Sequence, residues 1–254
     1  MTTEIVDLIE SKISETQWSP EQVSGWLKKE QVIEVSHESI YRHVWADKRA
    51  GGTLYTHLRH RGKKYNRRGA IYAGRGCIPG RIDIDARPKV VEEKSRVGDW
   101  ELDTIVGKGN SGVIVSMVER GSKYIKLARA ENRGSETVSQ ALRDKLSPLQ
   151  DLVITMTADN GKEFSSHVEV SNALKAQMYF AKPYHSWERG LSEHSNGLVR
   201  QYFSKSTRFD NITDEEVQRI EDLLNSRPRK VLGFRTPLEV FEEARSSTAV
   251  ALHC

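Results

Sequence analysis

The feature that most constrains the fold is a nearly continuous apolar run at residues 152–158, which Asp159 follows directly. A strand with apolar side chains on both faces is typical of a parallel sheet that helices cover on both sides. The carboxyl ends of such strands are where α/β sheets place their ligands. Asp159 is therefore a candidate site residue. The alternative is a hairpin, because Asp159-Asn160-Gly161 is also a turn sequence.

The residues beyond Asp159 favour a helix over a hairpin. Their apolar positions recur at helical spacing and do not alternate: Phe164, Val168, Ser171, Leu174 and Met178. A further helix is predicted at Ser135–Leu146 and a short strand at Met178–Ala181. Together these elements predict an α/β fold in which strands and helices are interspersed.

A strand predicted at Gly98–Val106 carries several acids. Side chains alternate along a strand, which puts Asp99, Glu101 and Asp103 on one face and Trp100, Leu102 and Thr104 on the other. Two more β-rich runs follow after glycine-containing turns, at Val113–Val118 and Tyr124–Ala130, and complete a three-stranded meander. The acidic face either belongs to a site or is simply solvated.

A third acid, Glu193, falls on an amphipathic helix that begins near Gly190. One face of this helix is mainly apolar: Leu191, Ser195, Leu198, Val199 and Tyr202. The other face holds Glu193, Asn196, Gly197 and Arg200. A glycine on a polar face indicates that another group approaches closely, although an exposed glutamate on a helix is usually surface.

Four long motifs in this order resemble the transposases of the insertion-sequence-thirty family, whose catalytic core is RNase H-like. They are G-D-W-E-L-D-T-I-V-G (98–107), T-A-D-N-G-K-E-F (157–164), P-Y-H-S-W-E-R-G-L-S-E-H-S-N-G-L-V-R-Q-Y-F (183–203) and L-N-S-R-P-R-K-V-L-G-F-R-T-P-L-E-V-F (224–241). Thirty-three residues separate Asp159 from Glu193, a spacing similar to that of insertion-sequence transposases. The resemblance covers most of the chain from Trp18 to Phe241.

The resemblance implies a DDE-type transposase, a polynucleotidyl transferase. Asp103, Asp159 and Glu193 would then be the catalytic and metal-binding carboxylates, with Asp99 as the substitute if the strand register differs. Oxygen ligands of this kind suit Mg²⁺, with Mn²⁺ as a substitute, and a pair of such ions supports in-line phosphoryl transfer. The implied partners are double-stranded DNA, at element ends and target, and further copies of the chain on that DNA.

The first 47 residues predict a small all-α helix-turn-helix domain. Trp18-Ser19-Pro20-Glu21-Gln22-Val23 is a capping sequence, and Val35–Ile40 repeats the pattern. Helices are therefore expected at Pro20–Lys29 and His37–Asp47, after an earlier one that carries Ile5, Leu8, Ile9 and Ile13. On the last helix, His37, Ser39, Arg42 and His43 are expected to face outward toward a DNA groove. The alternative is a bundle that only packs on the rest.

Residues 48–88 predict a basic, flexible linker. No acid occurs between Asp47 and Asp83, whereas ten cations do: Lys48, Arg49, Arg59, Arg61, Lys63, Lys64, Arg67, Arg68, Arg75 and Arg81. The formal net charge of the whole chain is only +4, so its basicity is concentrated here. Glycines and tyrosines are interleaved. We expect an arm that follows DNA phosphates, with Arg61, Lys63, Lys64, Arg67 and Arg68 as contacts. Arg200 is a further candidate contact, with a surface salt bridge as the alternative.

Composition excludes several other classes. Two cysteines, Cys77 and Cys254, give no disulfide framework, and His57, His60 and Cys77 match no standard zinc finger. No apolar stretch approaches a membrane span and no signal peptide opens the chain, so a cytoplasmic protein is expected. The resemblance implies a bacterial one that is associated with the nucleoid when bound to DNA.

The expected organisation is a helix-turn-helix domain at 1–47, the linker at 48–88, an RNase H-like α/β core at 89–245 with a mixed sheet flanked by helices, and a tail at 246–254. The resemblance also implies another helix-turn-helix upstream, for which this chain starts too late. The alternatives to a transposase are therefore a truncated DNA-binding remnant that occupies element ends or modulates a full-length partner, and a related nuclease that cuts without joining.

Overall fold

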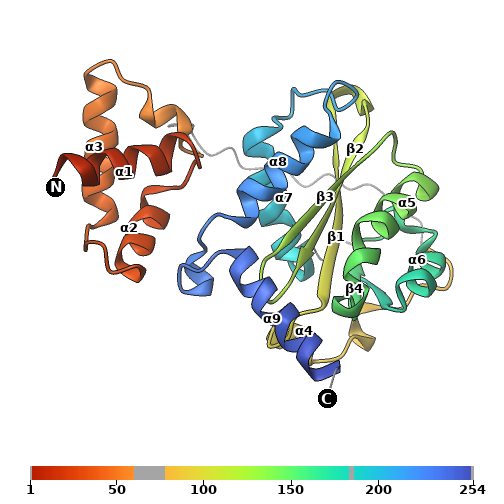
Figure 1. The fold of residues 1–254 in the computed structure, drawn as a ribbon. Coiled ribbons are helices and arrows are strands. Elements are labelled where there is room, and N and C mark those ends of the chain that lie inside the picture. Colours follow the sequence, from red (N-terminus) through yellow and green to blue (C-terminus); the bar gives the residue numbers. More distant parts are fainter. Residues whose placement is uncertain (1, 60–77, 183–185, 253–254) are drawn as a thin grey trace. The chain divides into compact units, whose positions relative to one another are not determined.

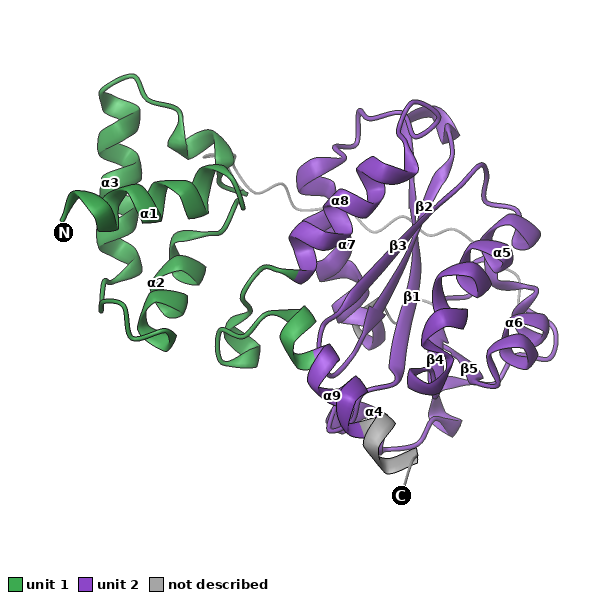
Figure 2. Cartoon of the chain, viewed as in Figure 1, with its two compact units in different colours: residues 1–71, 226–240 green, residues 72–225, 241–254 purple. Residues whose placement is uncertain are grey.

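The computed structural model describes residues 2–59, 78–182 and 186–252. The chain divides into two compact units, which Figure 2 distinguishes by colour. Unit 1 comprises residues 1–71 and 226–240, and unit 2 comprises residues 72–225 and 241–254. No helix among the described residues combines the length and the apolar character that crossing a bilayer requires.

Unit 1 is built on three helices: α1 (Thr3–Ser14), α2 (Pro20–Lys29) and α3 (His37–Arg49) (Figure 1). The predicted capping box is confirmed, since the side chains of Ser19 and Gln22 each accept from the other residue's backbone N–H. The helices enclose a small core, whose buried side chains include Ile9, Ile13, Trp18, Val23, Leu27, Ile40 and Val44. The bounds of α2 are as predicted, and α3 runs two residues further.

The segment 226–240, which the sequence analysis assigned to the catalytic core, belongs to unit 1. It contains the 3-10 turn η7 (Lys230–Leu232) and the start of α9 (Pro237–Leu252). The side-chain amide of Gln22 donates to the carbonyl of Pro228 at 2.9 Å. The ring of Phe234 lies so close to Gly25 that an added Cβ would be 2.2 Å from it. No local pattern reports such contacts between distant parts of a sequence.

Unit 2 contains a five-stranded mixed sheet in the order β3-β2-β1-β4-β5. The strands are β1 (Asp99–Val106), β2 (Val113–Glu119), β3 (Ile125–Ala130), β4 (Thr155–Ala158) and β5 (Gln177–Phe180). The first three form the predicted antiparallel meander. Strand β4 is parallel to both of its neighbours, β1 and β5, which confirms the interpretation of the apolar run. The strand is shorter than that run: the 3-10 turn η4 (Ser147–Leu152) includes Leu152, and the strand begins at Thr155.

Helices cover both faces of this sheet, as Figure 1 shows. On one face α5 (Ser135–Leu146) and α6 (His167–Leu174) pack with Trp100 and Leu102 of β1. On the other, α7 (Gly190–Tyr202) and α8 (Asp214–Asn225) pack with Ile105 of the same strand. The core of unit 2 thus has two layers, separated by the alternation of β1. This mixed α/β architecture is consistent with the predicted RNase H-like core.

The helical face predicted after Asp159 is wrong in its phase. A 3-10 turn, η5 (Lys162–Phe164), comes first, and α6 begins only at His167. Val168, expected to be inward, is 56% exposed, whereas Val170 and Leu174 are buried. A 3-10 helix has 3.0 residues per turn and an α-helix has 3.6. The positions that face inward therefore shift where the 3-10 turn is followed by the α-helix.

The prediction of a flexible linker at 48–88 is wrong at both of its ends. The turn η1 (Leu54–His57) and Leu58 bury apolar side chains in unit 1. The turn η2 (Ile84–Ala86) and the short helix α4 (Val90–Glu93) flank Arg87, whose guanidinium donates to Thr157 of β4. Because charged residues dominate this segment, the sequence pattern did not indicate that a few of its apolar residues are buried. The middle of the linker, at 60–77, lies outside the described residues.

Helix α8 supplies the hydrogen bonds that edge strand β3 lacks on its outer side. The amide of Asn225 donates to Ile125 O and accepts from Ile125 N, both at 2.8 Å, and Glu221 accepts from Leu127 N at 2.7 Å. Asn225 and Glu221 are both buried. Side chains of a helix therefore occupy the place of a sixth strand and protect the edge.

We expect Asn225→Ala to lower the free energy of unfolding by about 2–4 kcal/mol, because it leaves a buried N–H and a buried C=O of Ile125 without partners. Urea denaturation followed by circular dichroism measures the change. Arg219→Ala, on the exposed side of the same helix, is the matched control and should change stability by less than about 0.5 kcal/mol. Equal effects of the two substitutions would contradict this account of the edge.

Candidate active site

The three acids of β1 lie on the α7 side of the sheet, and two of them are tied into the fold. Asp99 is held by Arg96 through two contacts of 2.9 Å and accepts from Thr155 Oγ1 at 2.7 Å. Glu101, 1% exposed, forms an ion pair with buried Arg120. It also accepts from the backbone N and the hydroxyl of Ser192 on α7, at 2.9 and 3.1 Å. Both acids therefore have complete structural roles, and Asp99 is a poor substitute for Asp103.

Asp103 is placed differently. Its side chain is 17% exposed, and its contacts orient the carboxylate without enclosing it. Asn196 Nδ2 on α7 donates to Oδ2 at 2.8 Å, and the backbone N of Thr104 donates to Oδ1 at 2.9 Å. Asn196 Oδ1 is itself buried and accepts no hydrogen bond from the described residues. Asp103 is thus the acid of this strand that is available to a ligand.

Asp159 directly follows β4, and its turn fixes its direction. The backbone N of Gly161 donates to Asp159 Oδ1 at 2.7 Å, which is an Asx-type turn and not a hairpin. Asn160 anchors the same turn by donating to Ala181 O at 2.6 Å. A Cβ at residue 161 would lie 2.7 Å from Asp159 Oδ1. Glycine is therefore needed here for close approach.

The guanidinium of Arg189 connects the two aspartates. Its Nη1 lies 3.5 Å from Asp103 Oδ2, and its Nη2 lies 3.4 Å from Asp159 Oδ2. Arg189 is the residue before α7, and its side chain is 9% exposed. No local pattern in the sequence indicates that Arg189 joins the two acids. The structure therefore brings Asp103 and Asp159 together at the guanidinium of Arg189.

The pKa of Asp103 is raised. Burial is the largest cause; the charge of Asp159 adds to it, while Arg189 and the hydrogen bonds from Thr104 and Asn196 act in the opposite direction. The negative form is therefore disfavoured in the folded protein. The two carboxylates are close enough to repel one another, and a cation at their oxygens relieves that repulsion.

Glu193 is not gathered with the aspartates. It is exposed on the first turn of α7, three residues before Asn196, which touches Asp103. Residues three apart on a helix are neighbours, so Glu193 lies one turn from the site. Within the described part of the chain, no group of three His, Cys, Asp or Glu is arranged to hold a metal ion. The role of Glu193 as a third ligand stays a prediction.

The donor chemistry of the site fits a hard divalent cation. Asp103 and Asp159 present carboxylate oxygens, which hydrogen bonds from Thr104, Asn196 and Gly161 hold in direction. Oxygen ligands of this kind are those that Mg²⁺ and Mn²⁺ prefer. The residues that would hold such an ion are thus present, although Arg189 occupies the space between the aspartates.

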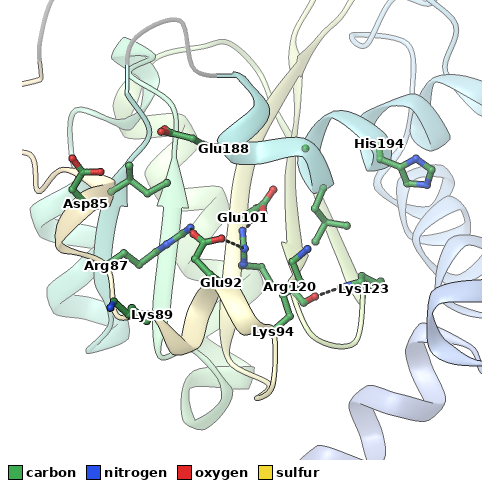
Figure 3. A pocket seen from close by; sticks show the side chains of 13 residues that line it. Asp85, Arg87, Lys89, Glu92, Lys94, Glu101, Arg120, Lys123, Glu188 and His194 are labelled. Carbon is green, nitrogen blue, oxygen red and sulfur yellow. Dashed lines mark hydrogen bonds and ion pairs between the residues drawn. The ribbon is translucent and has the colours of Figure 1, made fainter.

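A cavity of about 660 Å³ lies on the same side of the sheet, between α4, the strands β1 and β2 and the start of α7. Figure 3 shows that charged side chains line it, among them Arg87, Glu92, Glu101 and Arg120. Glu92 forms ion pairs with both arginines, and Arg120 also pairs with Glu101. Burial and the nearby charge of Arg120 lower the pKa of Arg87 to about 10. The positive and negative charges of these side chains neutralise one another. The side chains that line this part of the cavity therefore form a structural ion-pair network.

The remaining predicted DNA contacts have mixed positions. Arg42 is exposed on α3, and Ser39 is half-buried beside the N-cap residue Ser36. His43 pairs with Glu10 of α1 at 2.7 Å and is thus engaged within unit 1. Arg61, Lys63, Lys64, Arg67 and Arg68 lie outside the described residues.

Arg200 of α7 contacts the end of β1. Its Nη2 donates to Val106 O at 2.7 Å, and its guanidinium carbon lies 5.6 Å from the centre of the Phe209 ring. It is half-buried and forms no surface salt bridge among the described contacts. A role in binding DNA stays a prediction.

Fold and site together define a class. A mixed sheet in the order β3-β2-β1-β4-β5 with helices on both faces is consistent with an RNase H-like core, and Asp103 on β1 and Asp159 after β4 lie together in it. Comparison with known proteins makes the assignment specific. The chain is 45% identical over 240 residues to a transposase for insertion sequence element IS4351 from Bacteroides fragilis, covering 94% of this chain and 74% of that protein.

Two further relatives agree. Transposase InsI for insertion sequence element IS30A from Escherichia coli strain K12 is 35% identical over 246 residues, or 92% of this chain and 63% of its own length. A transposase for insertion sequence element IS1086 from Cupriavidus metallidurans is 36% identical over 237 residues, or 89% of this chain and 69% of its own length. No protein-family model matches. The chain belongs to the insertion-sequence-thirty (IS30) family of transposases and spans about two thirds to three quarters of these relatives.

The three acids of β1 should respond differently to neutralisation. Glu101→Gln should lower the free energy of unfolding by about 3–5 kcal/mol, because it removes the buried counter-charge of Arg120 and leaves only the exposed Glu92. Asp103→Asn should cost little at pH 7 and should raise stability slightly in the metal-free protein. A raised pKa means that the stabilising protonated form is present below the ordinary pKa and is lost as the pH rises.

Urea denaturation in EDTA at pH 7 and at pH 4 distinguishes these outcomes. The advantage of Asp103→Asn should shrink at the lower pH, where wild-type Asp103 is increasingly protonated. A loss from Asp103→Asn as large as that from Glu101→Gln would show that Asp103 is also a structural acid.

Proposed function

We propose that this chain is a DDE-type transposase, which cleaves DNA at the ends of a mobile element and joins the freed 3′-hydroxyl to target DNA. Asp103, Asp159 and Glu193 are the proposed catalytic carboxylates and metal ligands. The observation that carries the proposal is the convergence of Asp103 and Asp159 on Arg189 from two different strands. Carboxylates are costly to bury near one another unless they serve a cation.

Each proposed ligand is prepared by its neighbours. Asn196 and the N–H of Thr104 orient Asp103, and the N–H of Gly161 orients Asp159. Glu193 lies on the first turn of α7, and Asn196 on the next turn contacts Asp103 of β1. Two Mg²⁺ ions bound to these oxygens, with Mn²⁺ as substitute, would supply the Lewis-acid chemistry that activates the attacking oxygen and stabilises the leaving one.

DNA affinity must come from other parts of the chain, because a carboxylate site repels phosphates. The proposed sources are α3 of unit 1 with Ser39, Arg42 and His43, the basic arm with Arg61, Lys63, Lys64, Arg67 and Arg68, and Arg200 of α7. These residues would bind double-stranded DNA at element ends and target. Further copies of the chain are proposed partners, since two element ends have to be handled together.

The activity test combines the protein with Mg²⁺, a labelled element-end duplex and a plasmid target. Joined product is expected from the wild-type chain, and Asp103→Asn, Asp159→Asn and Glu193→Gln should each reduce it on the order of a thousandfold or more. Glu136→Gln, an exposed acid on α5, is the matched control and should leave joining unchanged.

The other outcomes identify the alternatives. Binding without cleavage points to a DNA-binding remnant, and cleavage without joining points to a nuclease. If Asp159→Asn joins DNA as well as the wild type does, the assignment of the metal ligands is wrong.

Arg42 tests the proposed role of α3. Arg42→Ala should weaken binding of element-end DNA, and the slope of log K against log salt should fall by about one if the side chain neutralises one phosphate. Arg219→Ala removes the same charge from an exposed position on α8 and is expected to leave the slope unchanged. Fluorescence anisotropy over a salt series gives both values. Equal slopes for wild type and Arg42→Ala would remove Arg42 from the DNA interface.

A further inference from the structure

We propose that Arg189 is the internal counter-cation of the metal site: its guanidinium holds Asp103 and Asp159 in the metal-free protein and has to leave them when a divalent cation binds. This inference rests on the proposed function, and it concerns a residue to which that function assigns no part. Arg189 is therefore a positioning residue that sets how strongly the site takes up metal.

The geometry of Arg189 differs from that of the structural arginines nearby. Arg96 grips Asp99 through two bonds of 2.9 Å, as expected for a strong charge-assisted pair. Arg189 reaches its two carboxylates at only 3.4 and 3.5 Å and donates to Leu102 O at 3.3 Å. Its Nε is buried and donates to none of the described residues. The guanidinium thus has long contacts and an unsatisfied donor, which makes it easier to displace than Arg96.

The charges explain why a cation has to be there. Asp103 and Asp159 have side chains that are 17% and 16% exposed, so water screens them poorly. The guanidinium of Arg189 lies within 3.5 Å of an oxygen of each carboxylate and offsets their negative charge. Without a positive charge beside them, the two carboxylates would repel one another.

A divalent cation and Arg189 compete for the same oxygens. Mg²⁺ binds oxygen ligands at about 2.0–2.1 Å, much closer than the guanidinium nitrogens lie. Arg189 contacts Oδ2 of Asp103 and Oδ2 of Asp159, and a cation held by these two carboxylates would draw on the same side chains. Two positive groups at these oxygens repel one another, so binding of one weakens binding of the other.

The position of Arg189 links its release to α7. It is the N-cap residue of the helix, makes no side-chain cap bond, and precedes Gly190, around which a Cβ would find no atom within 4 Å. No described atom therefore packs against Gly190, and the first anchor of the helix on β1 is Ser192, which donates to Glu101. Glu193 lies four residues further along, on the first turn. Movement of this turn displaces Arg189 and repositions Glu193 together, which accounts for a third ligand that is not gathered with the aspartates here.

Mn²⁺ titration by isothermal calorimetry tests this inference on the full chain without DNA. Arg189→Gln should bind Mn²⁺ at least about fivefold more tightly than the wild type, because a competing charge is gone. Arg189→Lys keeps the charge and should remain near wild-type affinity. Arg129→Gln removes an arginine from the surface pair with Asp214 and controls for net charge.

Thermal unfolding supplies a second readout that does not depend on activity. In EDTA, Arg189→Gln should melt below the wild type, since the aspartates lose their counter-cation, and Mn²⁺ should raise its melting temperature more than that of the wild type. A merely structural arginine would lower the melting temperature equally with and without Mn²⁺. That result, or a Mn²⁺ affinity that is unchanged or weaker in Arg189→Gln, overturns the inference.

Failure of the proposed function gives a different pattern. If Asp103→Asn and Asp159→Asn bind Mn²⁺ as the wild type does, the metal ligands themselves are misassigned. If these two variants lose Mn²⁺ binding while Arg189→Gln shows no gain, the ligands stand and only the role of Arg189 is wrong.

Discussion

The site depends on how the negative charge on the α7 side of β1 is compensated. Alternation along the strand puts Asp99, Glu101 and Asp103 on that side, where the low local dielectric makes an uncompensated carboxylate costly. Arg96 and Arg120 neutralise the first two and fix them in the fold. Asp103 is left with a cation that it shares with Asp159. The same face of β1 thus carries two acids with structural roles, Asp99 and Glu101, and one acid, Asp103, that is available for chemistry.

Helix α7 is the second part of this arrangement, because it runs along β1 in step with it. Ser192 contacts Glu101, Asn196 contacts Asp103 and Arg200 contacts the carbonyl of Val106. Positions four apart on the helix thereby contact β1 at points progressively further along the strand. The helix bears the proposed third ligand and is preceded by Arg189. A small change at its start would therefore alter the whole charge balance of the site.

Much of this could be predicted from sequence. Capping residues indicated the bounds of α2, the helix predicted at Ser135–Leu146 coincides with α5, and the apolar run before Asp159 correctly indicated a parallel strand. The phase of α6 was missed, because a 3-10 turn interrupts the period. Ion pairs such as Arg120 with Glu101, and the bridge of Arg189 to two aspartates, join residues from separate elements. Local patterns carry no signal for them, and the same holds for the packing of Phe234 against Gly25.

Anomalous diffraction from crystals of the chain soaked in Mn²⁺ is the most direct test of the central claim that Asp103 and Asp159 form a cation site. The account predicts a manganese peak between the two carboxylates, within about 2.0–2.3 Å of an oxygen of each, with the guanidinium of Arg189 withdrawn. Manganese bound elsewhere while Arg189 still contacts both aspartates would contradict it.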